Sequence, residues 1–422
     1  MKNIIDELIW RGLIQNSVPN LKNILKKPIT IYVGFDPTSN SLHIGNLLII
    51  ITLIHFKKFG YNTIILIGGA TGLIGDPSGK ESERKILNKS ILKTNIISIK
   101  IQIYKLFKSF SEKIELLNNF DWIKQISFID FIRKVGKYLS VNYLISKDSV
   151  KHRMENGISF NEFSYSLIQG YDFYYLNKTK NCKLQIGGSD QWGNITLGIE
   201  LIRKKTGKKV YGFTIPLIIR NNGIKFGKSN RVEDNIWLDE NKTSPYKFYQ
   251  YFINLSDIEI EKYIKMYSFL SKEKIEYLIA KHKENPEKRL LQKKLSTELT
   301  KLVHGDEKYK EILNVVSILF DKNYKNIKFL GKEDYISIYN NIPNNILSKK
   351  EFNNGIYLSN LLKKSGLINS NSESIRAIKN NSIYVNKISI KKDILIDERH
   401  IIGKKYIILQ YGKKNFFILI IK

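Results

Sequence analysis

The sequence has almost no cysteine: Cys182 is the single one among 422 residues. One thiol cannot build a disulfide framework within the chain, nor can it supply the cysteines of a zinc-ribbon site. These two classes of small stabilised scaffold are therefore excluded. The low cysteine content fits a reducing compartment, and we expect a cytoplasmic protein.

Apolar runs long enough to cross a bilayer are also missing. The most apolar stretches, Leu47–Phe56 and Ile64–Gly75, are too short or too glycine-rich for a span, which needs about 20 apolar residues. The first residues, Met1–Gln15, carry Asp6 and Arg11 among apolar positions. This pattern is typical of an amphipathic helix rather than of a secretion signal. The sequence predicts no membrane anchor.

Acidic residues are scarce relative to basic ones, with 39 aspartates and glutamates against 69 lysines and arginines and a net charge of +30. Such a surplus favours a polyanionic partner such as RNA, because cationic side chains displace its counterions. A second explanation stays open. Lysine, isoleucine and asparagine are all abundant and share codons made largely of A and U, so a biased coding sequence can raise the charge by itself.

The length of 422 residues predicts two or three domains, and 42% hydrophobic with 26% charged residues is typical of a globular protein. Two apolar runs, Ile29–Gly34 and Asn62–Gly68, predict buried strands, and His43–Phe59 between them predicts a helix. Strand, helix and strand at this spacing form a βαβ unit, so we expect a parallel sheet. Lys183–Ile186 and Thr214–Ile218 are further strand candidates.

The second half of the chain changes character. Helical spacing with many charges occupies Ser244–Phe320, and the polar segment Tyr324–Lys350 contains Pro343 and resembles a linker. A compact mixed segment follows, with 14 basic and 5 acidic side chains over residues 350–422, a net charge of +9. Its expected helices and strands are Leu358–Ser365, Ser374–Lys379, Ile383–Val385 and Tyr406–Gln410. The sequence shows no internal repeat.

A candidate anion site begins at His43, directly after a strand and loop. The run His43-Ile44-Gly45-Asn46 opens a helix, where backbone N–H groups and the helix dipole favour phosphate oxygens. Gly45 has no Cβ and lets a base or ribose approach the backbone. When this tetrapeptide is taken alone, a capping histidine and a packing glycine are the commoner explanation.

A candidate phosphate-binding loop lies at Lys225-Phe226-Gly227-Lys228-Ser229. Two lysines on a glycine-containing loop can close over a substrate and neutralise developing phosphate charge. When the segment is considered alone, a solvated basic loop is the favoured explanation.

The two motifs together, in this order, resemble the two halves of the ATP site in class I aminoacyl-tRNA synthetases. Further motifs narrow the resemblance to the bacterial tyrosyl-tRNA synthetases, and it extends over essentially the whole chain. They are Tyr32–Thr38, Gly68–Arg84 (GGATGLIGDPSGKESER), Ile158–Phe173 (ISFNEFSYSLIQGYDF), Leu184–Asn194 (LQIGGSDQWGN) and Thr300–Gly305 (TKLVHG).

The resemblance implies a domain plan and an activity. The plan is a Rossmann-like parallel-sheet catalytic domain over residues 1–235, a helical anticodon-region domain over 236–322, a linker over 323–350, and a small α+β RNA-binding domain over 351–422. The implied activity joins L-tyrosine to its tRNA with ATP. Mg²⁺ bound with the phosphates is implied, and no structural metal.

The resemblance also implies a tyrosine pocket. Tyr32 and Asp172 are expected to meet the phenolic hydroxyl of the substrate, and Asp76, Tyr165 and Gln169 its ammonium group. The spacing of Tyr165, Gln169 and Asp172 at i, i+4 and i+7 supports one shared helix face independently. Gln185 and Gln191 are expected to complete the hydrogen bonding of the pocket.

ATP-binding roles follow from the same resemblance. Residues expected near the nucleotide are Gly34, Asp36, Thr38, His43, Gly45, Asn46, Gly188 and Asp190. Residues expected around the leaving pyrophosphate are Lys80, Arg84, Lys225, Lys228 and Ser229.

Some positions depart from the family pattern. The first motif usually ends in a second histidine, where this chain has Asn46, whose amide can still donate a hydrogen bond. Near the C-terminus, Asn381 and Lys387 occupy turn positions where glycine is usual. Arg376 is a candidate RNA contact or an ordinary solvated arginine. Phe160 is implied to pack across the two-fold axis of a homodimer, although an apolar residue there is more often core.

Two alternatives stay open at this point. A tryptophanyl-tRNA synthetase shares the architecture, but Tyr32 with Asp172 favours a phenol over an indole. An RNA-binding or regulatory protein that lost catalysis is the other, and the retained Asp36, His43 and Asp190 argue against it.

Overall fold

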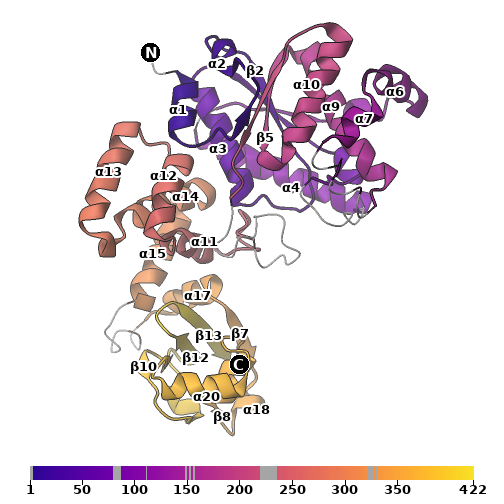
Figure 1. The fold of residues 1–422 in the computed structure, drawn as a ribbon. Helices are drawn as coiled ribbons and strands as arrows, with labels where there is room; N and C mark the ends of the chain where they lie inside the picture. Colours follow the sequence, from indigo (N-terminus) through magenta and orange to yellow (C-terminus); the bar gives the residue numbers. More distant parts are fainter. Residues whose placement is uncertain are drawn as a thin grey trace. The chain divides into compact units, whose positions relative to one another are not determined.

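The computed structural model describes residues 3–78, 87–110, 112–147, 150–151, 154, 157–218, 235–320, 327 and 330–422. The chain divides into two compact units. The first comprises Met1–Lys242 with Phe252–Val303, and the second comprises Thr243–Tyr251 with His304–Lys422. Figure 1 shows the elements of both. The finer division expected from the sequence stays a prediction.

A six-stranded sheet forms the centre of the first unit, with the strand order β1-β6-β5-β2-β3-β4. β1 is antiparallel to β6, and every other neighbouring pair is parallel. The strands are β1 (Asn16–Ser17), β2 (Thr30–Phe35), β3 (Asn62–Ile67), β4 (Glu115–Asn118), β5 (Cys182–Gly188) and β6 (Tyr211–Ile215). The expected parallel α/β sheet is confirmed.

The first unit also contains helices before, between and after these strands in the chain. They are α1 (Ile4–Trp10), α2 (Leu21–Ile24), α3 (Ile44–Lys58), α4 (Lys89–Lys108), α5 (Phe120–Ile123), α6 (Phe128–Lys134), α7 (Val141–Ile145), α9 (Phe160–Lys180), α10 (Trp192–Thr206), α12 (Asp257–Tyr267) and α13 (Lys272–Glu284). α11 (Pro245–Ile253) and α14 (Leu290–His304) run across the boundaries between the units. In the part of the chain that the structure describes, no helix has the length and apolar character of a membrane span.

The βαβ unit expected from the sequence is β2, α3 and β3. α3 is apolar enough for ten of its residues to be buried, and His43 caps its N-terminus. β2 and β3 are paired from Thr30 with Asn62 to Phe35 with Ile67. Each strand of this parallel pair therefore ends at the same edge of the sheet, which is where ligands of such folds bind.

β6 begins three residues before the strand expected at Thr214–Ile218. Gly212 interrupts the apolar pattern of this strand. A Cβ on Gly212 would lie 2.3 Å from Cγ2 of Ile195, so α10 packs directly on the bare backbone. Packing against a helix, rather than side-chain pattern, explains this glycine in a strand.

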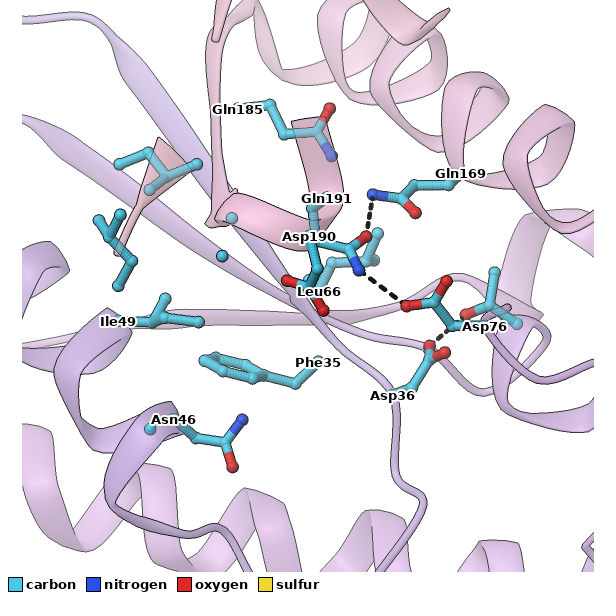
Figure 2. Close-up of a pocket in the computed structure, with 18 of the residues that line it drawn as sticks. Phe35, Asp36, Asn46, Ile49, Leu66, Asp76, Gln169, Gln185, Asp190 and Gln191 are labelled. Carbon is cyan, nitrogen blue, oxygen red and sulfur yellow. Dashed lines mark hydrogen bonds between the residues drawn. The ribbon is translucent and has the colours of Figure 1, made fainter. Parts of the chain in front are cut away.

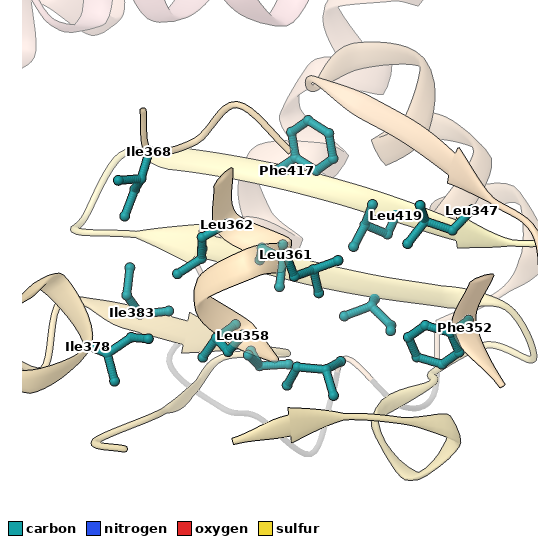
Figure 3. Close-up of a cluster of buried hydrophobic side chains, with 14 of the residues drawn as sticks. Leu347, Phe352, Leu358, Leu361, Leu362, Ile368, Ile378, Ile383, Phe417 and Leu419 are labelled. Carbon is teal, nitrogen blue, oxygen red and sulfur yellow. The ribbon is translucent and has the colours of Figure 1, made fainter. Parts of the chain in front are cut away.

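The second unit contains α15 (Asp306–Phe320) and a small α+β domain with a five-stranded sheet of order β10-β9-β12-β13-β7. Its remaining elements are α17 (Lys332–Asn341), β7 (Asn344–Leu347), α18 (Lys349–Phe352), β8 (Ile356–Tyr357), α19 (Leu358–Lys364), α20 (Asn371–Lys379), β9 (Ile383–Val385), β10 (Ile388–Ser389), β11 (Leu395–Ile396), β12 (Tyr406–Tyr411) and β13 (Asn415–Ile421). Leu358, Leu361 and Leu362 of α19 pack with Ile383 and Phe417 in one buried cluster (Figure 3).

The structure has a helix and a strand where the sequence predicted a linker over 323–350. Helix α17 and strand β7 lie inside that range, and β7 pairs in parallel with β13. Three of the four β7 residues are exposed and only Leu347 is buried, so the strand has no apolar alternation to reveal it. Asn381 and Lys387 adopt φ values of 54° and 67°, the left-handed conformation that glycine would adopt most easily.

Candidate active site

A cavity of about 210 Å³ opens where the parallel strands of the first unit end. Its walls come from the ends of β2, β3, β5 and β6 and from the first turn of α3. The lining side chains and backbone include Tyr32, Gly34, Asp36, Thr38, His43, Gly45, Asn46, Gly68, Thr71, Asp76, Asn119, Tyr165, Gln169, Asp172, Gln185, Gly188, Asp190 and Gln191. Fifteen residues that the sequence places in the tyrosine or ATP sites thus share this one cavity.

Asp172 is the acidic group at the buried end of the cavity and is only 2% exposed. Its Oδ1 accepts a hydrogen bond from Trp122 Nε1 at 2.8 Å, and its Oδ2 accepts one from Asn119 Nδ2 at 2.9 Å. Burial raises the pKa of Asp172 to about 7, against the lowering effect of these two hydrogen bonds. Each carboxylate oxygen can accept a further hydrogen bond, so the group can still receive a ligand hydroxyl.

Two polar groups that line the cavity are buried without a hydrogen-bond partner among the described residues. They are the hydroxyl of Tyr32 and Oε1 of Gln185, which belong to residues paired across β2 and β5. Desolvation raises the pKa of Tyr32 well above its ordinary value, so the phenol stays protonated. Buried polar atoms without partners are costly, and a polar ligand in the cavity would satisfy both.

A chain of amides surrounds Asp76. Gln191 Nε2 donates to Asp76 Oδ2 at 2.7 Å, and the backbone N–H of Ser78 donates to Oδ1 at 2.9 Å. Gln169 Nε2 donates to Gln191 Oε1 at 3.3 Å, and Asn194 Nδ2 donates to Oε1 of Gln169 at 2.9 Å. Figure 2 shows Gln191 between Gln169 and Asp76. A carboxylate with amide oxygens nearby is suited to bind an ammonium group.

Asp36 connects the two sides of the cavity. Its Oδ2 accepts from the Tyr165 hydroxyl at 2.8 Å, and its Oδ1 accepts from Thr71 Oγ1 at 2.7 Å. Thr71 Oγ1 in turn accepts from Asn119 Nδ2 at 3.1 Å. A Cβ on Gly68 would lie 2.0 Å from Asp36 Oδ1 and 2.3 Å from Thr71 Oγ1, so this network requires a glycine there.

The first turn of α3 forms the opposite wall. His43 Nδ1 accepts from the Gly45 N–H at 3.1 Å, and the His43 N–H donates to Asn46 Oδ1 at 3.1 Å, which makes a capping box. Neutral His43 therefore carries its proton on Nε2. Because Oδ1 of Asn46 accepts from the backbone, its Nδ2 is the group left to donate to a ligand.

The comparisons with known proteins agree with this geometry. Residues 24–321 match the family of class I tRNA synthetases (W and Y), and residues 336–419 match the C-terminal domain of the tyrosine–tRNA ligase SYY-like type. The chain is 46% identical to a tyrosine–tRNA ligase of Flavobacterium johnsoniae over 99% of both chains. It is 47% identical to one of Flavobacterium psychrophilum over the full length of both.

The chain belongs to the bacterial tyrosyl-tRNA synthetase family. Its fold is also similar to the crystal structure of a C-terminally truncated mitochondrial tyrosyl-tRNA synthetase from Aspergillus nidulans. That similarity has a TM-score of 0.67 at 30% identity and covers 74% of this chain and 92% of that one. The family resemblance drawn from the sequence motifs is thus confirmed.

Some residues named from the sequence lie outside the cavity, and others lie outside the described residues of this synthetase-family chain. Arg376 is exposed on α20 of the second unit. Phe160 is the first residue of α9 and is 68% exposed rather than core. The expected pyrophosphate group lies outside the described residues: Lys80, Arg84, Lys225, Lys228 and Ser229.

The structure adds three residues that the sequence analysis did not name individually. Asn119 and Trp122 hold Asp172, and Thr71 joins Asn119 to Asp36. Asn119 and Trp122 follow β4 directly, and polar residues at the carboxyl end of a parallel strand point to a site. Strand β4 itself gave no strand signal, because its two leucines stand between Glu115 and Asn118 and form neither a long apolar run nor an alternation.

Proposed function

We propose that this member of the tyrosyl-tRNA synthetase family activates L-tyrosine with ATP and transfers it to the 3′ end of the tyrosine tRNA. The observation that carries the choice of amino acid is the buried end of the cavity. There a fully desolvated Asp172 lies beside the unpartnered hydroxyl of Tyr32. A substrate phenol would donate to the carboxylate and satisfy Tyr32, whereas phenylalanine would leave both groups unpaired.

In the proposed first step the tyrosine carboxylate attacks the α-phosphorus of ATP. A new carboxyl–phosphorus bond forms as the bond to the β-phosphate oxygen breaks, and pyrophosphate leaves with the electron pair. The nucleophile is already ionised, so no general base is needed. Asp76, Gln169 and Gln191 would hold the ammonium group, and Tyr165 would lie beside them through its bond to Asp36. The contribution of the protein is positioning.

The ATP side of the proposal uses the first turn of α3. Gly45 exposes its backbone, while His43 and Asn46 offer N–H donors to ATP oxygens. Asp190 lines the same cavity and would accept a ribose hydroxyl. Mg²⁺ would bind together with the phosphates of ATP, because this ion is commonly held by phosphate oxygens and water. A carboxylate such as that of Asp36 would suit its preference for oxygen ligands.

In the second step a terminal ribose hydroxyl of the tRNA attacks the activated carbonyl, and AMP leaves. We propose that the basic C-terminal domain contributes to tRNA binding and that exposed Arg376 is one contact. The activity would operate in the cytoplasm, where tRNA is charged.

We also propose a homodimer, supported by exposed apolar side chains between residues 128 and 160. Among the described residues from 128 to 160, the large apolar side chains that are more than 60% exposed are Phe128, Ile129, Val141 and Phe160. Exposed apolar groups of this size mark interaction surfaces. Sedimentation of the purified chain and of Phe160→Asp tests the proposal: the native chain is expected as a dimer and the variant as a monomer.

A pyrophosphate-exchange assay with each of the twenty amino acids tests the proposed activity. Exchange driven by tyrosine alone is the expected result. Exchange driven by tryptophan would show instead that the chain has the activity of a tryptophanyl-tRNA synthetase. Absence of exchange with every amino acid would favour an RNA-binding protein that has lost catalysis.

A further inference from the structure

A tyrosine from the helical part of the first unit reaches the backbone of the ATP-binding turn. The Tyr267 hydroxyl donates to the carbonyl oxygen of Ile44 at 2.9 Å. Tyr267 is the last residue of α12 and is fully buried, and its ring stacks on Tyr263 with centroids 5.6 Å apart. Ile44 lies between His43 and Gly45 in the first motif. The bond therefore joins two segments more than 200 residues apart in the sequence at the ATP site.

The same turn is held from a second direction. The Ile44 N–H donates to the carbonyl oxygen of Ile236 at 3.0 Å, and the Leu238 N–H donates to that of Leu42 at 2.8 Å. Both backbone polar groups of Ile44 are thus bonded to segments later in the chain. The N–H groups at the start of a helix have no partner within the helix, so these external bonds determine where the turn lies.

Tyr267 is itself firmly placed. The guanidinium of Arg11, 2% exposed, donates from Nη1 to the carbonyl oxygens of Lys265 and Ser268, both at 2.7 Å. Its Nη2 donates to that of Leu270 at 2.6 Å. A buried, charge-assisted set of hydrogen bonds therefore fixes the end of α12, where Tyr267 lies.

We infer that Tyr267 is a positioning residue for the use of ATP. This inference rests on the proposed function. Through Ile44, its hydroxyl sets the position of the turn that carries His43 Nε2 and Asn46 Nδ2. A turn that shifts by a fraction of an ångström would misalign both donors with the nucleotide, and positioning errors of this kind reduce rate rather than fold stability alone. Neither residue of this hydrogen bond belongs to the proposed tyrosine pocket. The loss of the bond should therefore change the kinetics with ATP and leave those with tyrosine unchanged.

The test is Tyr267→Phe in the full-length chain, which removes the hydroxyl and keeps the ring. The expected result in pyrophosphate exchange is a loss of about fivefold in kcat/KM for ATP, with KM for tyrosine unchanged. Tyr61→Phe is the matched control. Tyr61 also donates to a buried backbone carbonyl, that of Leu25 at 2.5 Å, but it lies outside the cavity. The control should lower Tm to a similar extent and leave the kinetics with ATP unchanged.

A double-mutant cycle sharpens the test. If Tyr267 acts through the first turn, Tyr267→Phe and Asn46→Ala should be less than additive in kcat/KM for ATP, whereas Tyr61→Phe and Asn46→Ala should be additive. Normal ATP kinetics in Tyr267→Phe, or equal losses for ATP and tyrosine, would overturn the inference. Native chain that shows no tyrosine-dependent exchange would instead refute the proposed function. If another amino acid drives exchange, the ATP comparison is made with that amino acid.

Discussion

The two ends of the cavity are held in place by different means. At the proposed tyrosine end, side chains bond to other side chains: Asp172 to Asn119 and Trp122, and Asp76 to Gln191. At the proposed ATP end, the first turn of α3 is held mainly through its backbone, by Ile236 and Tyr267. Selectivity for one amino acid requires fixed polar partners, whereas the nucleotide requires a correctly placed main chain. Substitutions should therefore separate the two kinetically.

The largest effect is expected from Asp172→Asn. The asparagine has one acceptor oxygen for the two donors Asn119 and Trp122, so one buried donor is left unpaired and the negative charge is lost. We expect a fall of about 1,000-fold in kcat/KM for tyrosine, with KM for ATP nearly unchanged. Steady-state pyrophosphate exchange measures both. An equal loss for both substrates would contradict the separation of the two ends.

The same variant should change the pH dependence of stability. The pKa of Asp172 is about 7 in the folded chain and near 3.8 in the unfolded chain, so the folded state binds this proton more tightly. The stabilisation from protonation is present below about pH 4 and is lost as the pH rises through about 7. The free energy of unfolding in urea should therefore fall over this range more in the native chain than in Asp172→Asn. Parallel curves would show that Asp172 does not titrate there.

Gly68→Ala should impair the use of both tyrosine and ATP, because Gly68 lies where the two ends of the cavity meet. Its Cβ would collide with Asp36 and Thr71, and Asp36 also accepts from Tyr165. We expect a loss of about 100-fold in kcat, with KM raised for both substrates. Gly12→Ala makes the same chemical change outside the cavity, at a φ of 72° with no atom near the added Cβ. This control should lower stability through its positive φ and leave KM for both substrates unchanged.

Trp122→Phe is a finer change at the tyrosine end. It removes one donor to Asp172 while keeping an aromatic ring to stack on Tyr175, whose centroid lies 4.4 Å away. KM for tyrosine should rise about tenfold, and the kinetics with ATP should stay unchanged. Unchanged KM for tyrosine would mean that Asn119 alone is enough to orient the carboxylate.

The sequence predicted those parts of the molecule in which local pattern and structure agree. The βαβ unit, the helix that carries Tyr165, Gln169 and Asp172, and the small C-terminal domain were expected from periodicity and motifs, and the structure contains them. Their signals are strong because strands buried on both faces read as continuous apolar runs and a helix face repeats every 3.6 residues.

Other features could not be read from the sequence because they depend on contacts between distant segments. Strand β7 is polar and is defined by its pairing with β13. Trp122 lies 50 residues from Asp172, and Tyr267 lies 223 residues from Ile44. No periodic pattern encodes such a pair. The capping box shows the opposite case, because His43 and Asn46 are only three residues apart and still required the structure to reveal how they bond.

The smallest effect is expected at Asn46, at the ATP end. Asn46→Ala removes both the oxygen that accepts from the His43 N–H in the capping box and the Nδ2 group proposed to donate to the nucleotide. We expect a loss of about fivefold in kcat/KM for ATP and none for tyrosine. Asn46→His introduces the residue usual in the family and should recover activity to within about twofold, because an imidazole can accept from the His43 N–H and still donate through its other nitrogen. If alanine is tolerated as well as histidine, the side chain at this position makes no contact with ATP, and the ATP end relies on its backbone alone.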